Sequence, residues 1–386
     1  MSGSSRILFV RWEVAIAVGL LCRGDFNVAR LWRGGGRYRM KMPLNFNFGW
    51  KPLIGPLASM RISLLAASVV VTGFAAIGGA QRISAQQAVT AKPRIADGFS
   101  TDWANLTIEV RELAQGVYLL HGSGGNTLAS VGADGTLLVD TEFAQVAPKL
   151  KAALAKLQAG PVKYVISSHY HGDHTGANAA FHEEGATIVG QENCRLRMTE
   201  SRLSGLTGKT SPPAPLASLP TLTYDRRLTL YMNGEEIEAF YKQPSHTDGD
   251  SIVYFHHANV VHMGDVFVNN LYPYIDMGAK GTIDGYFPVI DEVLGRIDDG
   301  TKVVPGHGPL ATKKELKAYR DMLQTVRDRV AAQIAGGKTL EEILASHPTL
   351  EFDAQYATDR VDGDGFVATV YQSLTGKRLD WHPPKV

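Results

Sequence analysis

The chain has 386 residues, of which 44% are hydrophobic and 20% charged, a composition typical of globular proteins and sufficient to bury a sizeable core. Its net charge of +1 conceals an asymmetry: residues 1–59 contain nine Lys or Arg and two Asp or Glu, whereas residues 60–386 contain 30 basic and 36 acidic residues. Because residues 60–386 are acidic, they are a poor partner for a phosphate backbone, and we expect no nucleic-acid substrate. The chain has only two cysteines, which excludes a disulfide framework and a cysteine-rich metal site.

Residues 60–85 have the layout of a secretory signal peptide. The charged start at Met60 and Arg61 is followed by an apolar run that ends at Ile77 and then by small residues. This run is shorter than the about 20 apolar residues that a membrane span needs. Because a signal peptide should begin a chain, we predict that translation starts at Met60 and that residues 1–59 are spurious or disordered. The alternative is a membrane anchor with a basic cytoplasmic tail.

The signal predicts a periplasmic or secreted protein that meets a membrane only through residues 60–85, if they are not cleaved. Residues 86–104 are polar and contain Pro93, so we interpret them as a linker. The folded domain is predicted at residues 105–330, and a C-terminal helical extension packed on it at residues 331–386. The sequence predicts no oligomeric state.

Apolar periodicity predicts two successive series of strands, each followed by a helix and by a last strand that leads into a histidine-containing loop. The first series comprises strands at Leu106–Leu113, Val117–His121, Thr127–Val131 and Thr136–Asp140, a helix at Ala144–Gln158 and a strand at Val162–Ser168. The second comprises strands at Thr221–Tyr224, Leu228–Tyr231, Glu235–Tyr241, Ile252–Phe255 and Val260–Met263, a helix at Ile283–Asp298 and a strand at Lys302–Val304. Three further helices are expected at Lys313–Ala335, Thr339–Leu344 and Gly365–Leu374. Two such halves indicate an α/β fold, a four-layer αββα sandwich of two facing sheets with helices outside.

The hexapeptide His-Tyr-His-Gly-Asp-His at residues 169–174 is the strongest chemical signal. Only 12 of 386 residues are His, so three within six positions are a concentrated group. His169 and His171 can point the same way from an extended loop, while Asp173 and His174 turn to the other side, so this loop can offer ligands to two metal ions. Neutral imidazole and carboxylate are ligands that Zn²⁺ and other divalent ions prefer.

Three later residues could complete a metal site. His246 follows a strand, Asp265 ends one, and His307 lies in the tight turn Pro-Gly-His-Gly-Pro. Asp140, at the end of Leu-Leu-Val-Asp, could fix the tautomer of a ligand histidine or, alternatively, cap a turn. Three polar residues downstream of Asp265 could bind a substrate carboxylate: Asn269, Asn270 and Lys280.

With these motifs in this order, residues 106–330 resemble the metallo-β-lactamase superfamily, whose fingerprint is His-x-His-x-Asp-His followed by spaced His, Asp and His. The resemblance implies the αββα fold and two divalent metal ions, expected to be Zn, with Fe or Mn as alternatives because the ligands are rich in oxygen. Three histidines would hold the first ion: His169, His171 and His246. Three residues from both halves would hold the second ion: Asp173, His174 and His307. Asp265 would bridge the two ions.

In such a site a metal-bound water has a pKa of about 7, so hydroxide is available without a Ser or Cys nucleophile. Asp173 could also orient the attacking water, so we predict a catalytic role for it. Together with export, this favours a metal-dependent hydrolase that uses metal-bound hydroxide on a small molecule, a cyclic amide or ester such as a β-lactam or a lactone, with antibiotic resistance as one biological role. The alternatives are a glyoxalase-II-like thioesterase and a non-catalytic metal-binding or sensor domain. By the resemblance, an Asp at position 265 is similar to the glyoxalase and lactonase branches of the superfamily.

Two features near this site carry weaker expectations. The loop Gly122–Asn126 is short, which predicts an open substrate groove. Cys194 is expected to be a small buried apolar residue.

Overall fold

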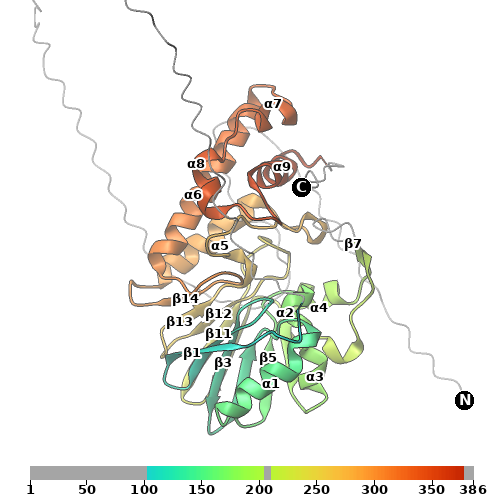
Figure 1. Cartoon of the computed structure of the whole chain (residues 1–386), viewed down its shortest axis with the longest axis vertical. Coiled ribbons are helices and arrows are strands. Elements are labelled where there is room, and N and C mark those ends of the chain that lie inside the picture. The colour runs from blue at the N-terminus through green and yellow to red at the C-terminus, as the bar shows by residue number, and fades with distance from the viewer. Residues whose placement is uncertain (1–101, 204–209, 378–386) are drawn as a thin grey trace, which may run out of the picture. The chain divides into compact units, whose positions relative to one another are not determined.

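The computed structural model describes residues 102–203 and 210–377, shown in colour in Figure 1. The predictions for residues 1–59 and 60–85, and most of the predicted linker, lie outside the described residues. No helix in the described ranges is both long and apolar enough to cross a membrane.

Seven strands form the first sheet, in the order β1-β2-β3-β4-β5-β6-β9. The first four are an antiparallel meander: β1 (Glu109–Ala114), β2 (Val117–His121), β3 (Thr127–Gly132) and β4 (Gly135–Val139). The last three add in parallel: β5 (Val162–Ile166), β6 (Thr187–Gln191) and β9 (Leu222–Tyr224). Parallel neighbours need crossover connections. These contain η1 (Ala144–Val146), α1 (Ala147–Lys156), α2 (Gly172–Thr175), α3 (Asn178–His182), α4 (Glu192–Met198), the small hairpin β7 (Arg202–Leu203) and β8 (Thr210–Ser211), and η2 (Leu216–Ser218).

Five strands form the second sheet, which repeats this plan. They are β10 (Arg227–Met232), β11 (Glu235–Phe240), β12 (Ile252–Phe255), β13 (Val260–His262) and β14 (Lys302–Val304). The first four pair antiparallel, and β14 adds parallel to β13. The crossover between them contains η3 (Gly264–Val266), η4 (Met277–Ala279) and α5 (Ile283–Arg296). Four helices follow: α6 (Lys313–Ala335), α7 (Leu340–Leu344), α8 (Leu350–Tyr356) and α9 (Gly363–Thr375).

Apolar clusters separate the layers. One cluster fills the space between the sheets, where Leu128 of β3 and Phe255 of β12 are fully buried. A second packs Leu150 of α1 and Phe181 of α3 on the outer face of the first sheet, on the side where Figure 1 shows these helices. The outer face of the second sheet is covered by α5 and α6. The predicted four-layer αββα sandwich is therefore confirmed.

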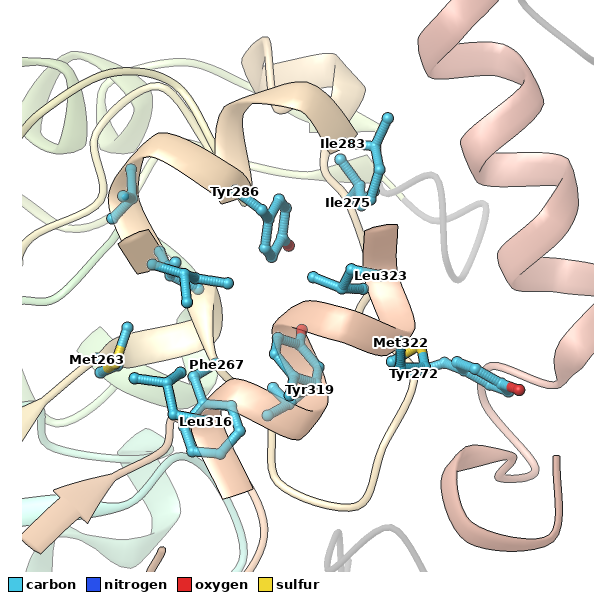
Figure 2. Close-up of a cluster of buried hydrophobic side chains, with 14 of the residues drawn as sticks. Met263, Phe267, Tyr272, Ile275, Ile283, Tyr286, Leu316, Tyr319, Met322 and Leu323 are labelled. Carbon is cyan, nitrogen blue, oxygen red and sulfur yellow. The ribbon is translucent and has the colours of Figure 1, made fainter. Parts of the chain in front are cut away.

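The cluster on the second sheet also includes the C-terminal helices. Figure 2 shows part of it, with Tyr286 of α5 and Tyr319 and Leu323 of α6. Phe366 of α9 is fully buried and stacks on Tyr272, with ring centroids 4.9 Å apart. The predicted domain boundary at residue 330 falls inside α6, and the helices beyond it share the core of the domain. The described part of the C-terminal segment, up to residue 377, thus contributes side chains to the same apolar cluster as α5 and α6.

Some elements differ from the prediction. The strand predicted at residues 221–224 belongs to the first sheet, where it pairs in parallel with β6, and β6 itself was not predicted. The strand β6 is buried along most of its length and does not alternate apolar and polar residues, and its parallel pairing with β9 joins segments distant in sequence, so neither feature has a local pattern. Cys194 is buried, as predicted, in a small cluster with Met198 and Leu219.

Candidate metal centre

All seven predicted ligands lie at one edge of the two sheets. The hexapeptide follows the end of β5, His246 lies in the loop between β11 and β12, Asp265 follows β13, and His307 follows β14. The carboxyl ends of β5, β13 and β14 therefore bring segments more than 130 residues apart to one place. Loops at a strand end can carry polar groups that the core of the sheet could not.

The seven side chains form two groups whose ligand atoms lie within 4.8 Å of one another, and each group could hold a metal ion: His169, His171, His246 and Asp265 in one, and Asp173, His174 and His307 in the other. In the first group, His171 Nδ1 lies 3.0 Å from both His169 Nε2 and His246 Nε2. In the second, the Nε2 atoms of His174 and His307 are 3.2 Å apart. The structure therefore collects the residues as the resemblance implied.

Asp265 lies between the groups and directs one oxygen toward each. Its Oδ2 is 3.9 Å from His169 Nε2 and 3.6 Å from His246 Nε2. Its Oδ1 is 3.2 Å from His174 Nε2 and 3.4 Å from His307 Nε2, yet this buried atom accepts no hydrogen bond. A buried carboxylate oxygen without a donor needs a positive partner. Asp265 could therefore bridge two ions, one held by each group.

Four candidate ligand histidines use their outer ring nitrogen to donate a hydrogen bond, which fixes the tautomer of each ring. His174 Nδ1 lies 2.7 Å from Asp140 Oδ2, and His246 Nδ1 lies 2.7 Å from the carbonyl oxygen of Tyr274. The other two pairs are His171 Nε2 with Asp276 Oδ2 and His169 Nδ1 with Ser168 Oγ, each at 3.0 Å. Carboxylate and carbonyl oxygens only accept, and the Ser168 hydroxyl donates to Asp140, so each of these outer nitrogens carries the hydrogen.

With the hydrogen on the outer nitrogen of each ring, the inner nitrogens of His169 and His246 each present a lone pair to that of His171 at 3.0 Å. Such contacts are repulsive unless a cation lies between them. Two nitrogens bound to one tetrahedral Zn²⁺ at 2.0–2.1 Å are about 3.3 Å apart, close to the spacing observed. The residues present therefore fit a divalent metal in each group.

Asp140 holds a histidine of each group, His174 directly and His169 through Ser168. Its buried carboxylate accepts hydrogen bonds from the Ser168 amide and hydroxyl at 2.6 Å and from His174 at 2.7 Å. Its backbone adopts the left-handed conformation, with φ of 64°, which is uncommon for a residue other than glycine. Such an outlier is maintained when the surroundings demand it. The predicted contact with a ligand histidine is present.

Two glycines permit the close approach of the loops. A Cβ at Gly306 would lie 2.0 Å from Asp265 Oδ1, and one at Gly125 would lie 2.2 Å from Cε1 of His174. Asn126 ties the two loops together, since its Nδ2 donates to the carbonyl oxygens of Pro305 and Gly308. Any side chain at these glycines would displace a candidate ligand.

Without bound metal, protons on histidine rings balance the negative charges of the buried carboxylates Asp173 and Asp265. Burial lowers the pKa of His169 well below its usual value, and the neighbouring His174 adds to this, so the His169 ring is neutral at pH 7. Burial acts in the same direction on His307, but the carboxylates of Asp265 and Asp173 outweigh it and raise the pKa of His307 to about 9. Burial would raise the pKa of Asp173, but His174 and His307 hold it below its usual range. A divalent ion can replace these protons as the balancing charge.

A cavity of about 680 Å³ adjoins the two groups, and His171, Asp173, Asp265 and His307 line part of it. Much of the remaining wall is apolar or aromatic, including Phe143, Tyr170, Met198, Leu271 and Tyr274. Arginines also contribute: Arg197, Arg202 and Arg360. Apolar walls with a few polar groups at one end are typical of small-molecule sites.

The cavity corrects two expectations about substrate contacts. The short loop Gly122–Asn126 does not line it, and segments 197–203, 211–218 and 358–361 supply walls in place of the predicted open groove. The three predicted substrate-binding residues do not line it either. Asn269 Nδ2 donates to Pro309 O, Asn270 Oδ1 accepts from Gln355, and the exposed Lys280 lies 3.8 Å from Asp248.

Sequence reasoning missed several residues that position the histidines: Ser168, Tyr170, Tyr274 and Asp276. Tyr170 and Ser168 adjoin the hexapeptide, so their proximity to the site was available from the sequence. Asp276 carried no such signal, because it reaches His171 across 105 residues and lies in no recognisable motif.

Comparison with known proteins agrees with this architecture. The family model described as the metallo-beta-lactamase superfamily matches residues 122–307. The chain is similar to 2,4-dinitroanisole O-demethylase subunit alpha of Nocardioides sp. (strain JS1661), at 27% identity over 195 residues, which are 50% of this chain and 55% of that protein. The chain thus matches about half the length of this curated relative.

The chain is also similar to solved structures, one of which shows the same fold. The stereoselective inverting sec-alkylsulfatase Pisa1 from Pseudomonas sp. superposes with a TM-score of 0.54 at 20% identity, over 72% of this chain and 52% of that one. A metallo-beta-lactamase from Pontibacter korlensis has a TM-score of 0.46 at 20% identity, over 56% of this chain and 99% of that one. At this identity the first likeness shows the fold alone.

Proposed function

Residues 122–307 belong to the metallo-β-lactamase superfamily, whose members are hydrolases, and on this basis we propose that the protein hydrolyses a small ester or amide with two divalent metal ions. The observation that supports this most is the position of Asp265 between two groups of imidazoles that border one cavity. We propose Zn²⁺ for both positions, with Fe or Mn as alternatives because two of the seven candidate ligands, Asp173 and Asp265, offer carboxylate oxygens.

Bound ions would supply hydroxide at neutral pH and polarise the carbonyl of the substrate. The protein residues provide the remaining functions. Asp173 lines the cavity, and its Oδ2 lies 3.2 Å from His307 Nε2, so the carboxylate can orient a water molecule beside the second group. We propose this as its catalytic role. His171 and His307 also border the cavity, so a substrate that enters it meets both groups at once.

The cavity favours a substrate with an apolar body. Its volume of about 680 Å³ suits a drug-sized molecule, and aromatic residues form part of the wall. A cyclic ester or cyclic amide, a lactone or a β-lactam, remains the leading candidate. The second candidate is an aryl ether, which the name of the O-demethylase relative and the aromatic side chains Phe143, Tyr170 and Tyr274 favour.

A substrate panel tests this proposal. The purified protein, reconstituted with Zn, Mn or Fe, is offered nitrocefin, an aryl-substituted lactone, dinitroanisole and S-lactoylglutathione, with and without a chelator. We expect hydrolysis of the lactone or nitrocefin that the chelator abolishes and added metal restores. Turnover of dinitroanisole alone would support the second candidate, and turnover of the thioester alone would contradict both. If no substrate reacts with any metal, the non-catalytic alternative replaces the proposal.

Export remains a separate proposal, supported by the signal-like residues 60–85. Expression of the chain in a Gram-negative host, followed by cell fractionation and mass spectrometry of the mature N-terminus, tests it. We expect periplasmic protein that begins after the small residues near Ala80. Full-length cytoplasmic protein would contradict it.

A further inference from the structure

One short segment, Tyr274–Asp276, holds the outer nitrogens of two histidines of the first group. The carbonyl oxygen of Tyr274 accepts from His246 Nδ1 at 2.7 Å, and the carboxylate of Asp276 accepts from His171 Nε2 at 3.0 Å. The backbone amide of Asp276 also donates to the carbonyl oxygen of His246 at 3.0 Å. The segment therefore contacts the first group three times, and none of these contacts reaches the second group.

The Asp276 side chain is buried and held by several hydrogen bonds. It is 5% exposed, and its other carboxylate oxygen, Oδ1, accepts from the amide of Ala279 at 3.1 Å, which caps η4. Oδ2 receives a second donor, the hydroxyl of Tyr170. The Tyr170 ring lies under the guanidinium of Arg202, 4.0 Å from the ring centroid. The carboxylate thus has a fixed orientation, and His171 has no freedom to turn away from the first group.

The two groups differ in their supporting carboxylates. In the second group, Asp140 accepts directly from His174; it also reaches the first group indirectly, through Ser168 to His169. The carboxylate of Asp276, by contrast, forms a hydrogen bond with the side chain of His171 alone among the candidate ligands. A carboxylate behind a ligand histidine fixes its ring and raises its basicity, and its loss typically costs about 10–100-fold in metal affinity.

We propose that Asp276 is the positioning residue of the first metal ion, so that the occupancy of this ion is set separately from that of the second. The inference rests on the two-ion site of the proposed function. His171 also lines the cavity, so the same carboxylate fixes the face that the first ion presents to a substrate.

Metal titration of Asp276→Asn tests the inference without reference to activity. Metal-stripped protein is titrated with Zn²⁺ against a chromogenic chelator, and anomalous scattering from crystals grown at limiting Zn²⁺ gives the occupancy at each position. We expect the affinity at the first position to fall about 10–100-fold and that at the second to change less than about threefold. Equal loss at both positions, or no loss, would overturn the inference.

Tyr170→Phe is the matched control, because it removes a donor to the same Oδ2 and leaves the carboxylate beside His171. Because the Ala279 amide still holds Oδ1 and His171 still donates to Oδ2, we expect the loss at the first position to be less than about threefold, well below that of Asp276→Asn, and the second position to be unchanged. Tyr170→Phe could instead lower the Zn²⁺ affinity at the first position as much as Asp276→Asn does. The affinity would then depend on the integrity of the segment Tyr274–Asp276 and not on the orientation of His171, and the inference would fail.

A measurement on the unaltered protein covers the case in which Asp276→Asn does not fold. In the Zn-loaded, ¹⁵N-histidine-labelled protein, His171 should carry a slowly exchanging Nε2 proton and bind metal through Nδ1. A rapidly exchanging proton there would contradict the inference. If the unaltered protein binds no Zn²⁺, the proposed function itself fails; two bound ions with unchanged affinity in Asp276→Asn refute only the role of Asp276.

Discussion

At the scale of single residues, Asp140 is the buried carboxylate that holds two candidate ligand histidines in place. A buried carboxylate in a left-handed backbone conformation is unfavourable by itself, yet three donors converge on it from Ser168 and His174. These donors belong to the strand end that delivers the hexapeptide. Asp140 therefore fixes the loop and both histidines beside it, His169 through Ser168 and His174 directly.

Asp140→Asn should weaken metal binding at both positions. Asn keeps the size of the side chain and tolerates positive φ, but it cannot accept from all three donors. We expect about 10–100-fold lower Zn²⁺ affinity at each position and a loss of about 1–3 kcal/mol in the free energy of unfolding of the metal-stripped protein. Chelator competition and urea unfolding measure the two effects. Loss at one position only would show that the route through Ser168 has no influence.

The stability of the metal-stripped protein should depend on pH through His307. The pKa of His307 in the folded state is raised from 6.5 to about 9, because Asp265 and Asp173 outweigh burial. A raised pKa gives stability that is fully present below pH 6.5 and is lost as pH rises toward 9. We expect the free energy of unfolding to fall over this window, by at most about 3 kcal/mol from this group, with His174 acting in the same direction.

Urea unfolding of the metal-stripped protein from pH 6 to pH 9.5 measures this dependence. In His307→Gln the slope should be smaller. Stability that rises with pH across the window would contradict the assignment of these protons.

At the scale of elements, the C-terminal helices belong to the domain that carries the site. Tyr272, which lies between the candidate ligands and α5 in sequence, donates from its hydroxyl to Asp353 of α8 and from its backbone amide to the carbonyl oxygen of Tyr356. The turn after α8 supplies Thr358, Arg360 and Val361 to the cavity wall. The helices beyond residue 330 thus contribute both to the core and to the space for a substrate.

Phe366→Ala should test this integration. The ring is fully buried against Tyr272, so its removal leaves a cavity where α9 meets α6, at a cost of about 3–5 kcal/mol. Leu350→Ala, at a position that is 67% exposed on α8, is the matched control and should change stability by less than about 0.5 kcal/mol. The midpoint of a single thermal transition measures both. A stable protein with Phe366→Ala, or a separate transition for the C-terminal helices, would show an independent unit.

At the scale of the whole molecule, periodicity predicted the layers because each half ends with a strand that leads into a histidine loop. The hexapeptide and its three later partners could be recognised because ligand types are chemically restricted and their order is fixed. The place of β9 and the role of Asp276 could not be predicted. Each depends on contacts between segments far apart in the sequence, and neither leaves a local pattern. The predictions of substrate-binding residues were wrong for the same reason. Asn269 and Lys280 lie near Asp265 in the sequence, but neither lines the cavity.

The site needs both halves of the chain. The first sheet supplies the hexapeptide and the second supplies His246, Asp265 and His307, so the candidate metal positions exist only when the sheets pack face to face. Bound metal should therefore stabilise the packed state as a whole, since an ion that binds only the folded chain shifts the equilibrium toward it.

Anomalous diffraction at the zinc edge from crystals of the Zn-reconstituted protein tests the central claim most directly. We predict two peaks about 3.5–4 Å apart, one among His169, His171 and His246 and the other among Asp173, His174 and His307, with Asp265 between them. A single peak, or zinc bound away from these residues, would contradict the account.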